Sequence, residues 1–455
     1  MKKFYLFFAL LFIISSTTLI SCGDKEENLI ENPGTDPDDD NNNDDNKDDD
    51  NKDDDNKDEG QDKQMSSYEQ KIFLEETGIE FVNSIKSTDF EELVNLANYA
   101  SDEYSEYDTE ELEEWADECF ESMLEYLGKE EESDYYSIYR YTNYSCLYVL
   151  SNFKGHFEAK NGQWVYSKAN DLQFAFKDQY GKKCTMNLTV AGKTKKVYIG
   201  REEDWFDYEY DDETDEYIDY INVYQNYLEI PEVIELTLTV NDSKMANVKL
   251  TTSLDIDGEE FNIERDNYSA SLSFSVADYS INVDKFSYNA QKDASVAISL
   301  KKGSKLLAKA SAYVEGYYRN EEIGAAKNAE IVFDILEKVK VKGECMDILR
   351  LADKVEKAEE YCDNEKTFKS YLSDINEMLD LNVYYNNSNT VQASVRIDAS
   401  CEDEWGEEYW YFEPVICFGD GTSYNTFDVF FDENDFEDLI RSFENLIEDF
   451  EWLLR

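Results

Sequence analysis

The sequence predicts an α+β fold, with N-terminal helices, a central antiparallel β-meander and a C-terminal region that mixes helices and strands. Three patterns predict this fold class. Apolar residues recur at helical spacing up to about residue 130, alternate with Ser and Thr from 232 to 316, and follow both periods after 319. With 34 Tyr and 26 Phe among its 455 residues, the chain has enough apolar surface to fill a core.

Composition divides the chain into five successive parts. We expect a signal peptide at 1–21, a lipidated cysteine with a disordered acidic tether at 22–64, a helical region at 65–130, an antiparallel β region at 131–318 and an α+β region at 319–455.

The first part begins with two lysines, Lys2 and Lys3, which precede an apolar run from Phe4 to Ile14. At about 1.5 Å per residue this run is too short to span a hydrocarbon core of ~30 Å. A positive start followed by a short apolar segment is typical of a signal peptide.

The leader ends in Leu19-Ile20-Ser21-Cys22. This ending resembles the lipobox of bacterial lipoproteins, with an aliphatic residue, a small residue and then the cysteine. The resemblance implies that Cys22 carries the lipid and that residues 1–21 are removed. A secretory leader with an incidental cysteine is the alternative.

The next residues include Lys25, Glu26 and Glu27. They resemble the export signal of surface lipoproteins in Bacteroidetes-type bacteria, and the whole arrangement is similar to uncharacterised lipoproteins of that group. The resemblance implies an outer-membrane protein that is lipid-anchored and displayed at the cell surface. A lipoprotein that faces the periplasm is the alternative.

The tether repeats a unit of Asn, Lys and three Asp, and it contains almost nothing that could be buried. High charge with low hydropathy predicts disorder. It lacks the residue pattern of a calcium loop, because no Asp-x-Asx-x-Asx-Gly is followed by the required glutamate. The segment is therefore interpreted as a solvated spacer.

The net charge of the chain, −61, narrows the classes of partner. The leader carries two lysines and the tether carries 19 acidic residues and five lysines, which leaves −49 on residues 65–455. Such a field repels phosphate, so we predict that nucleic acid is not a partner. The expected partners are the membrane, through the lipid anchor, and an unknown protein, glycan or apolar ligand.

Seven cysteines remain after Cys22, an odd number, and no C-x-x-C motif occurs. Disulfides are possible outside the cytoplasm. Two pairs, Cys345 with Cys362 and Cys401 with Cys417, flank predicted elements. The sequence does not fix their geometry, so their pairing stays open.

The helical region contains three amphipathic stretches between 66 and 128. Ser66 or Ser67 is expected to cap the first and Ser87 or Thr88 the second. The third begins at the pair Asp108 and Glu111 and is expected to end at Gly128.

The β region opens with a hairpin at Asn161-Gly162. An acidic stretch at 201–220 is expected to be a loop; the alternative is a calcium loop. From 232 to 316, strict alternation predicts an antiparallel meander with one apolar face and one Ser/Thr face.

The C-terminal region is expected to contain helices at 321–340, 345–360, 364–380 and 433–454, with strands at 391–400 and 409–418. Because six strands with a continuous apolar side expose more surface than a soluble monomer tolerates, something should cover that side. The helices at 321–340 and 433–454 have apolar stripes broad enough to do so.

We assign no catalytic residue, cofactor or metal site. The only histidine is His156, and the P-loop, G-x-S-x-G and G-x-G-x-x-G motifs do not occur. Three functions stay open: a tethered surface lipoprotein that acts as a binding or structural module, a carrier of an apolar ligand such as lipid, and a carbohydrate-active enzyme with paired carboxylates.

Overall fold

A computed structural model describes residues 64–123, 125–133, 139–211, 216–319, 322–404, 407–424, 427–431 and 435–454. Residues 63–455 form one compact unit. Cys22, Lys25, Glu26 and Glu27 lie outside the described residues, so lipidation and export stay predictions.

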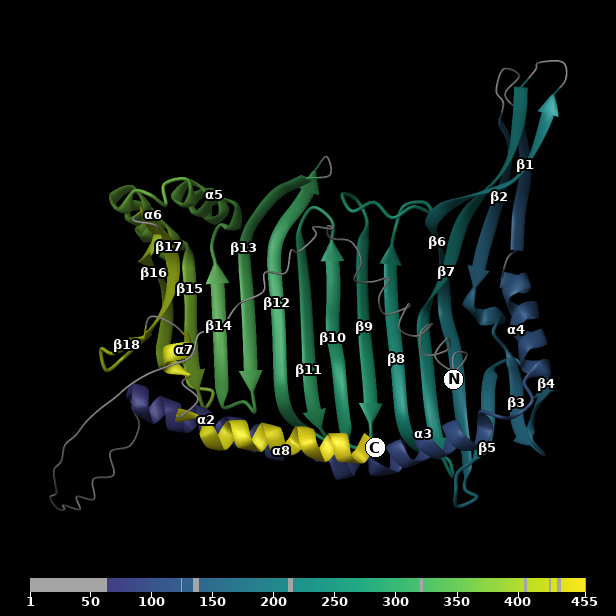
Figure 1. The fold of residues 1–455 in the computed structure, drawn as a ribbon, viewed down its shortest axis with the longest axis horizontal. Helices are drawn as coiled ribbons and strands as arrows, with labels where there is room; N and C mark the ends of the chain where they lie inside the picture. The colour runs from purple at the N-terminus through teal and green to yellow at the C-terminus, as the bar shows by residue number, and fades with distance from the viewer. Residues whose placement is uncertain are drawn as a thin grey trace. The chain divides into compact units, whose positions relative to one another are not determined.

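The predicted fold class is wrong, because the described residues are dominated by strands rather than being α+β with N-terminal helices. They form one mixed sheet of 18 strands, with 54% strand and 27% helix. The sheet is not confined to the centre of the sequence, and most helices lie along its margins (Figure 1). In segments such as 322–345, pairing with the neighbouring strands outweighs local helical spacing.

The strands begin soon after the N-terminal helices and continue almost to the C-terminus. They are β1 (Glu125–Ser133), β2 (Tyr139–Val149), β3 (Gly155–Lys160), β4 (Gln163–Ser167), β5 (Leu172–Lys177), β6 (Lys183–Asp211), β7 (Glu216–Val240), β8 (Ser243–Asp255), β9 (Asn267–Val276), β10 (Tyr279–Asn289), β11 (Asp293–Lys302), β12 (Lys305–Arg319), β13 (Glu322–Ile335), β14 (Val339–Cys345), β15 (Leu379–Tyr385), β16 (Ala393–Glu404), β17 (Glu407–Phe418) and β18 (Ser423–Tyr424).

The helices occur in two groups, one before the first strand and one in the last quarter of the chain. They are α2 (Ser67–Asn83), the 3₁₀ turn η1 (Ser87–Phe90), α3 (Glu91–Tyr104), α4 (Glu110–Met123), the 3₁₀ turn η2 (Leu150–Asn152), α5 (Ile348–Glu359), α6 (Glu365–Met378), α7 (Phe427–Phe430) and α8 (Glu437–Leu454).

Neighbouring strands are antiparallel from β5 through to β18, as the alternation from 232 to 316 predicts. Two parallel pairings, β2 with β7 and β3 with β5, make the sheet mixed. The hairpin predicted at Asn161-Gly162 is confirmed: it joins β3 to β4, and both residues have positive φ.

The acidic stretch at 201–220 is not a loop, so that prediction is wrong. Its described residues extend β6 and β7, which pair along their length, from Cys184 opposite Val240 to Asp211 opposite Glu216. Aromatic contacts hold this arm: the ring of Tyr217 lies 5.1 Å from that of Tyr210. Cross-strand aromatic pairs stabilise a ladder whose carboxylates repel one another.

The helix predicted at 321–340 is also wrong, because this segment forms β13 and β14. Ala329, Ile331, Phe333 and Ile335 alternate on one face, and this period competes with the helical one. The turn between the strands places Leu336 and Glu337 at φ of 56° and 59°. Neither is Gly or Asn, so the usual hairpin signal is missing from the sequence.

The other predicted helices form with small shifts. However, the cap expected at Ser87 or Thr88 is wrong, because both residues lie in η1, and α3 begins after Phe90, which makes no side-chain capping bond. Ser66 caps α2 in a capping box with Glu69. Asp347 and Asn364 cap α5 and α6, and the last helix is α8. The third N-terminal helix ends at Met123 rather than Gly128, because Gly128 lies within β1.

Helices α2, α3 and α8 run along one end of the strands (Figure 1). Phe81, Ile85 and Phe90 pack against a buried cluster of Tyr279, Leu307 and Leu336 at the ends of β10, β12 and β13. Farther along, Leu96 of α3 packs on Cys184 and Val240. These contacts leave the middle of the sheet outside the core.

Polar contacts fasten the same helices to the strand ends. Gln70 of α2 is fully buried and donates to the Gln392 carbonyl at 2.8 Å, while the Tyr385 hydroxyl donates to its side-chain oxygen at 2.8 Å. Asp89 of η1 accepts from Lys302 at 2.7 Å and from the Tyr279 hydroxyl at 2.8 Å, and both bonds lower the pKa of Asp89. The helical margin is therefore firmly attached.

Candidate binding surface

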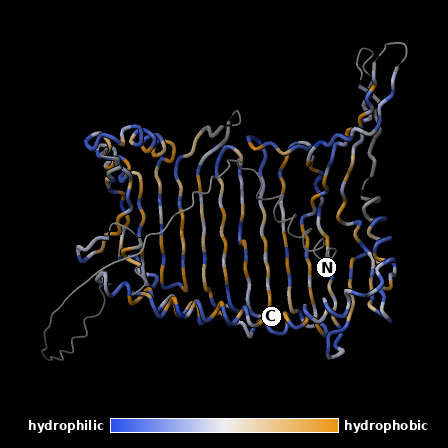
Figure 2. Tube along the Cα trace, in the orientation of Figure 1, coloured by the Kyte–Doolittle hydropathy of each residue, from blue (hydrophilic) through white to orange (hydrophobic). Residues whose placement is uncertain are grey.

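One face of the central sheet is built from apolar side chains in continuous rows. The register of β9 to β15 aligns three such rows, which run Leu272–Val283–Ile298–Ala310–Phe333–Val341–Val383, Phe274–Ile281–Leu300–Ala308–Ile335–Val339–Tyr385 and Ala270–Phe286–Val296–Ala312–Ile331–Gly343–Leu381. None of these residues is charged. The alternation along the central strands is visible in Figure 2.

The opposite face is polar at the same strands. Ser299, Lys309, Asp334 and Lys340 are aligned across β11 to β14, and Lys342 forms an ion pair with Glu330 at 3.3 Å. The sheet therefore separates an apolar side from a polar one, as the sequence predicts for 232–316. The polar side carries Lys, Asp and Glu in addition to the predicted Ser and Thr.

The apolar rows are exposed where they cross β9 to β13. Five large side chains define what we call the open apolar face: Phe274 is 39% exposed, Ile281 47%, Ile298 43%, Ile331 55% and Phe333 44%. Single exposed apolar residues are common on protein surfaces, but a contiguous group on adjacent strands marks an interaction site.

A groove runs along β12 within this face. Its floor is Ala310 and Ala312, and its walls are Ile298 and Val296 on one side and Ile331 and Phe333 on the other. The hollow has a volume of about 280 Å³ and opens to solvent. Small residues between two ridges of large ones give the face a corrugated relief.

The helices do not close this face, so the expectation that 321–340 and 433–454 cover it is wrong. The first of these segments is itself part of the sheet. The second, α8, packs on α2, where a Cβ on Gly78 would lie 2.7 Å from Leu439 Cδ1. In Figure 1 no described helix crosses the middle of β9 to β13.

Two helical segments border the face at its ends. Phe368 of α6 is buried against Phe412, with ring centroids 4.7 Å apart. At the other end of the sheet, Trp115 of α4 lies 5.0 Å from Phe157. The open apolar face is thus the stretch between these covered regions.

A second hollow, of about 340 Å³, lies beside α3 and is lined by Glu91, Glu92 and Asp178 with Tyr180 at its rim. This is the place most similar to a paired-carboxylate site. However, Asp178 accepts from the amides of Tyr180 and Lys182, and Lys182 also reaches Glu92 at 3.5 Å. These carboxylates hold a turn together, so we assign them no catalytic role.

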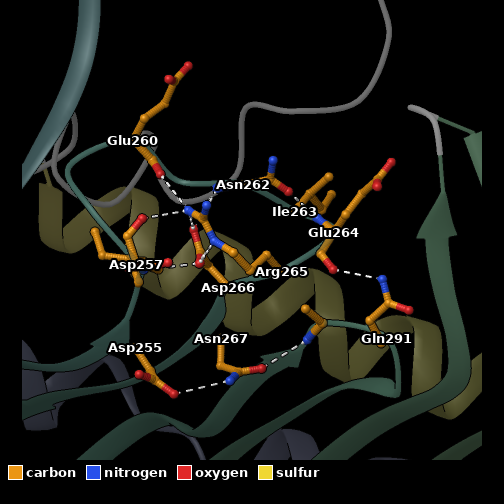
Figure 3. A network of polar contacts seen from close by, with 12 residues as sticks. Asp255, Asp257, Glu260, Asn262, Ile263, Glu264, Arg265, Asp266, Asn267 and Gln291 are labelled. Carbon is orange, nitrogen blue, oxygen red and sulfur yellow. Dashed lines mark hydrogen bonds and ion pairs between the residues drawn. The ribbon is translucent and has the colours of Figure 1, made fainter.

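A buried carboxylate lies in the loop between β8 and β9 (Figure 3). Asp266 is 1% exposed and accepts hydrogen bonds from the amides of Asp257 and Asn262 and from Arg265. Arg265 also donates to the Asp257 and Glu260 carbonyls. The hydrogen bonds from Arg265, followed by the amides, lower the pKa of Asp266 to about 2. Its oxygens are satisfied within the loop, which makes the network structural.

The remaining residues considered from the sequence do not form a reactive centre. His156 lies at the surface, where its Nε2 is 2.8 Å from Asp171. Cys345, Cys362 and Cys417 are thiols, so neither candidate disulfide is formed. The thiol of buried Cys184 has its pKa raised by desolvation to about 11, which keeps it protonated and unreactive.

The calcium alternative for 201–220 finds no support in the part of the chain that the structure describes. Asp204 lies on β6, whereas Asp212 and Asp215 fall outside the described residues. Within the described ranges no cluster of three or more His, Cys, Asp or Glu side chains could hold a metal ion.

Comparisons with protein-family models, with curated proteins and with solved structures found no match for this chain. Among the described helices, none combines the length and the apolar character needed to cross a membrane.

The sequence predicts part of this surface but not its centre. Phe274, Ile281 and Ile298 belong to the predicted apolar side of the meander. Ile331 and Phe333 lie in the segment whose helical spacing predicts a helix, although the alternation Ala-Glu-Ile-Val-Phe-Asp-Ile at 329–335 is a signal for a strand.

Proposed function

We propose that this chain is a tethered cell-surface lipoprotein whose folded unit is a binding module, with the open apolar face as its binding surface. The observation that carries the proposal is the exposure of five large apolar side chains on adjacent strands, in rows without a charged residue. The folded unit has a net charge of −49, yet this exposed area contains no charged residue. An exposed apolar area of this kind is expected to contact an apolar partner.

A test of the surface compares two variants of the chain from residue 22 onward, each with Cys22→Ser so that it stays unlipidated. Ile331→Lys with Phe333→Lys should abolish binding of a hydrophobic dye, because it places two charges in the exposed centre of the open apolar face. Tyr313→Lys is the matched control: it is 40% exposed and lies on the polar face, opposite Glu330. Equal dye binding by both variants would refute the proposal.

A test of the anchor uses the source cells. Incorporation of a palmitate analogue should disappear in Cys22→Ala, because the thiol is the acceptor. Replacing Lys25, Glu26 and Glu27 by alanine should keep the protein in the membrane but protect it from protease added to intact cells. Retained label, or unchanged protease sensitivity, would contradict the respective part of the proposal.

The groove along β12 favours a second candidate, a carrier of an apolar ligand. A chain of methylenes could lie on the alanine floor between the two ridges. Lipid extracted in a fixed ratio from purified protein, and detected by mass spectrometry, would favour this candidate.

A further inference from the structure

We infer that the open apolar face binds a second copy of this chain, with the two sheets stacked face to face. This inference rests on the proposed function, because it names the partner of the same surface.

The exposed area supplies a substantial part of what a protein–protein contact needs. At about 150–200 Å² for a full large apolar side chain, the five residues of the open apolar face leave about 400 Å² exposed. A standard interface buries about 800 Å² on each partner, so these side chains provide about half of one side. Partly buried apolar neighbours in the same rows, such as Leu272, Val296 and Leu300, extend the surface.

The relief of the face is complementary to itself. Ridges of large side chains on β11 and β13 flank the alanine groove of β12, and adjacent strands are about 4.8 Å apart. A two-fold axis lying between two such sheets can therefore place Ile331 and Phe333 of one copy over Ala310 and Ala312 of the other. Interdigitation of this kind is how two sheets pack at ~10 Å, and a two-fold contact uses the same patch twice.

The charge distribution favours an uncharged partner surface. The rows contain no group that could pair with a basic or acidic partner, so such a partner would gain nothing at the centre of the contact. The net charge of −49 makes two copies repel at long range, but at physiological ionic strength the Debye length is only about 8 Å. Association should therefore strengthen as salt is added, opposite to a contact made by ion pairs.

A small apolar ligand fits this face less well. Binding sites for small molecules usually enclose about 70–90% of the ligand surface. The groove of about 280 Å³ is open along its length, so a single acyl chain lying in it would keep one side in water. A flat, corrugated partner covers the whole face at once.

The test measures self-association by sedimentation at increasing protein concentration and at two salt concentrations. The protein is the chain from residue 22 onward with Cys22→Ser, in reductant, because seven further cysteines could otherwise form intermolecular disulfides. We expect a monomer–dimer equilibrium in the micromolar range that tightens with salt. Ile331→Lys with Phe333→Lys should weaken it at least 100-fold, since a two-fold contact carries each change twice, whereas Tyr313→Lys should leave it unchanged.

The outcomes separate this inference from the proposed function. A monomer at 100 µM that still binds hydrophobic dye, or that carries lipid, overturns the second copy as partner and leaves the binding surface in place. A dimer that both variants leave intact overturns the inference as well, because the contact is then elsewhere. A monomer that binds no dye overturns both. Circular dichroism and the melting temperature of each variant show that it remains folded.

Discussion

Replacing Gln70 by methionine should loosen helix α2 from the sheet. The Gln70 side chain is fully buried and makes three hydrogen bonds: it donates to the Gln392 carbonyl at 2.8 Å and the Met65 carbonyl at 3.0 Å, and it accepts from Tyr385 at 2.8 Å. Methionine keeps the volume and removes all three. Each buried group left without a partner costs about 1–3 kcal/mol, so we expect a loss of about 2–5 kcal/mol.

A double substitution isolates the coupling between Gln70 and Tyr385. Tyr385→Phe alone leaves the Gln70 side-chain oxygen unpaired in the interior, at a cost of about 1–3 kcal/mol. Once Gln70 is methionine, Tyr385→Phe removes a hydroxyl that already lacks its partner. The double variant should therefore be more stable than the sum of the two losses by about 1–2 kcal/mol.

Amide hydrogen exchange across residues 67–83 is the suitable assay, because a unit of this size need not unfold in a single step. Gln70→Met should speed exchange in α2 by at least tenfold while the central strands are unaffected. Glu76→Met, an exposed change on the same helix, should alter local stability by less than about 0.5 kcal/mol. Additive losses in the double variant would refute the idea that Gln70 and Tyr385 act as a pair.

Three further predictions concern other contacts. The pKa of Asp266 in the folded chain, about 2, lies below its unfolded value of about 3.9, so the carboxylate stabilises the fold fully above pH 4 and this stabilisation disappears as the pH falls toward 2. Asp266→Asn should therefore make the melting temperature less dependent on pH over that range and should speed proteolysis of the β8–β9 loop. An unchanged pH profile would contradict this. Gly78→Val should displace α8 by collision with Leu439, detected as faster exchange throughout α8; unchanged exchange would show that the close approach is not needed. Asn376→Ala removes two hydrogen bonds to the backbone of Ile397, of 2.7 Å to its carbonyl and 2.8 Å from its amide. The Ile397 amide should then lose about 1–3 kcal/mol of protection against hydrogen exchange. Retained protection would mean that another group accepts its hydrogen bond.

Several elements could be predicted from local sequence because their patterns admit one interpretation. The helices α4, α5, α6 and α8 have capping residues or long apolar stripes, and the hairpin at Asn161-Gly162 has the residues that its turn requires. The segment 322–345 could not, because its apolar residues fit both periods and its turn residues, Leu336 and Glu337, adopt positive φ without Gly or Asn. Pairing with β12, the strand directly before it, decides between the two periods. That contact is a property of the folded sheet and not of the segment's own pattern.

Local sequence is enough to predict that one side of the meander is apolar and the other polar, because a strand places alternate residues on opposite faces. The net charge and the candidate anchor at Cys22 also follow from the sequence alone. Which part of the apolar side is covered depends on the packing of the folded chain. An amphipathic stripe on α8 is compatible with any apolar surface, and in the fold it packs on α2 at the strand ends, which leaves Ile298, Ile331 and Phe333 exposed. A pattern specifies that a face will exclude water, but the partner of that face is set by distances and connections that exist only in the folded chain.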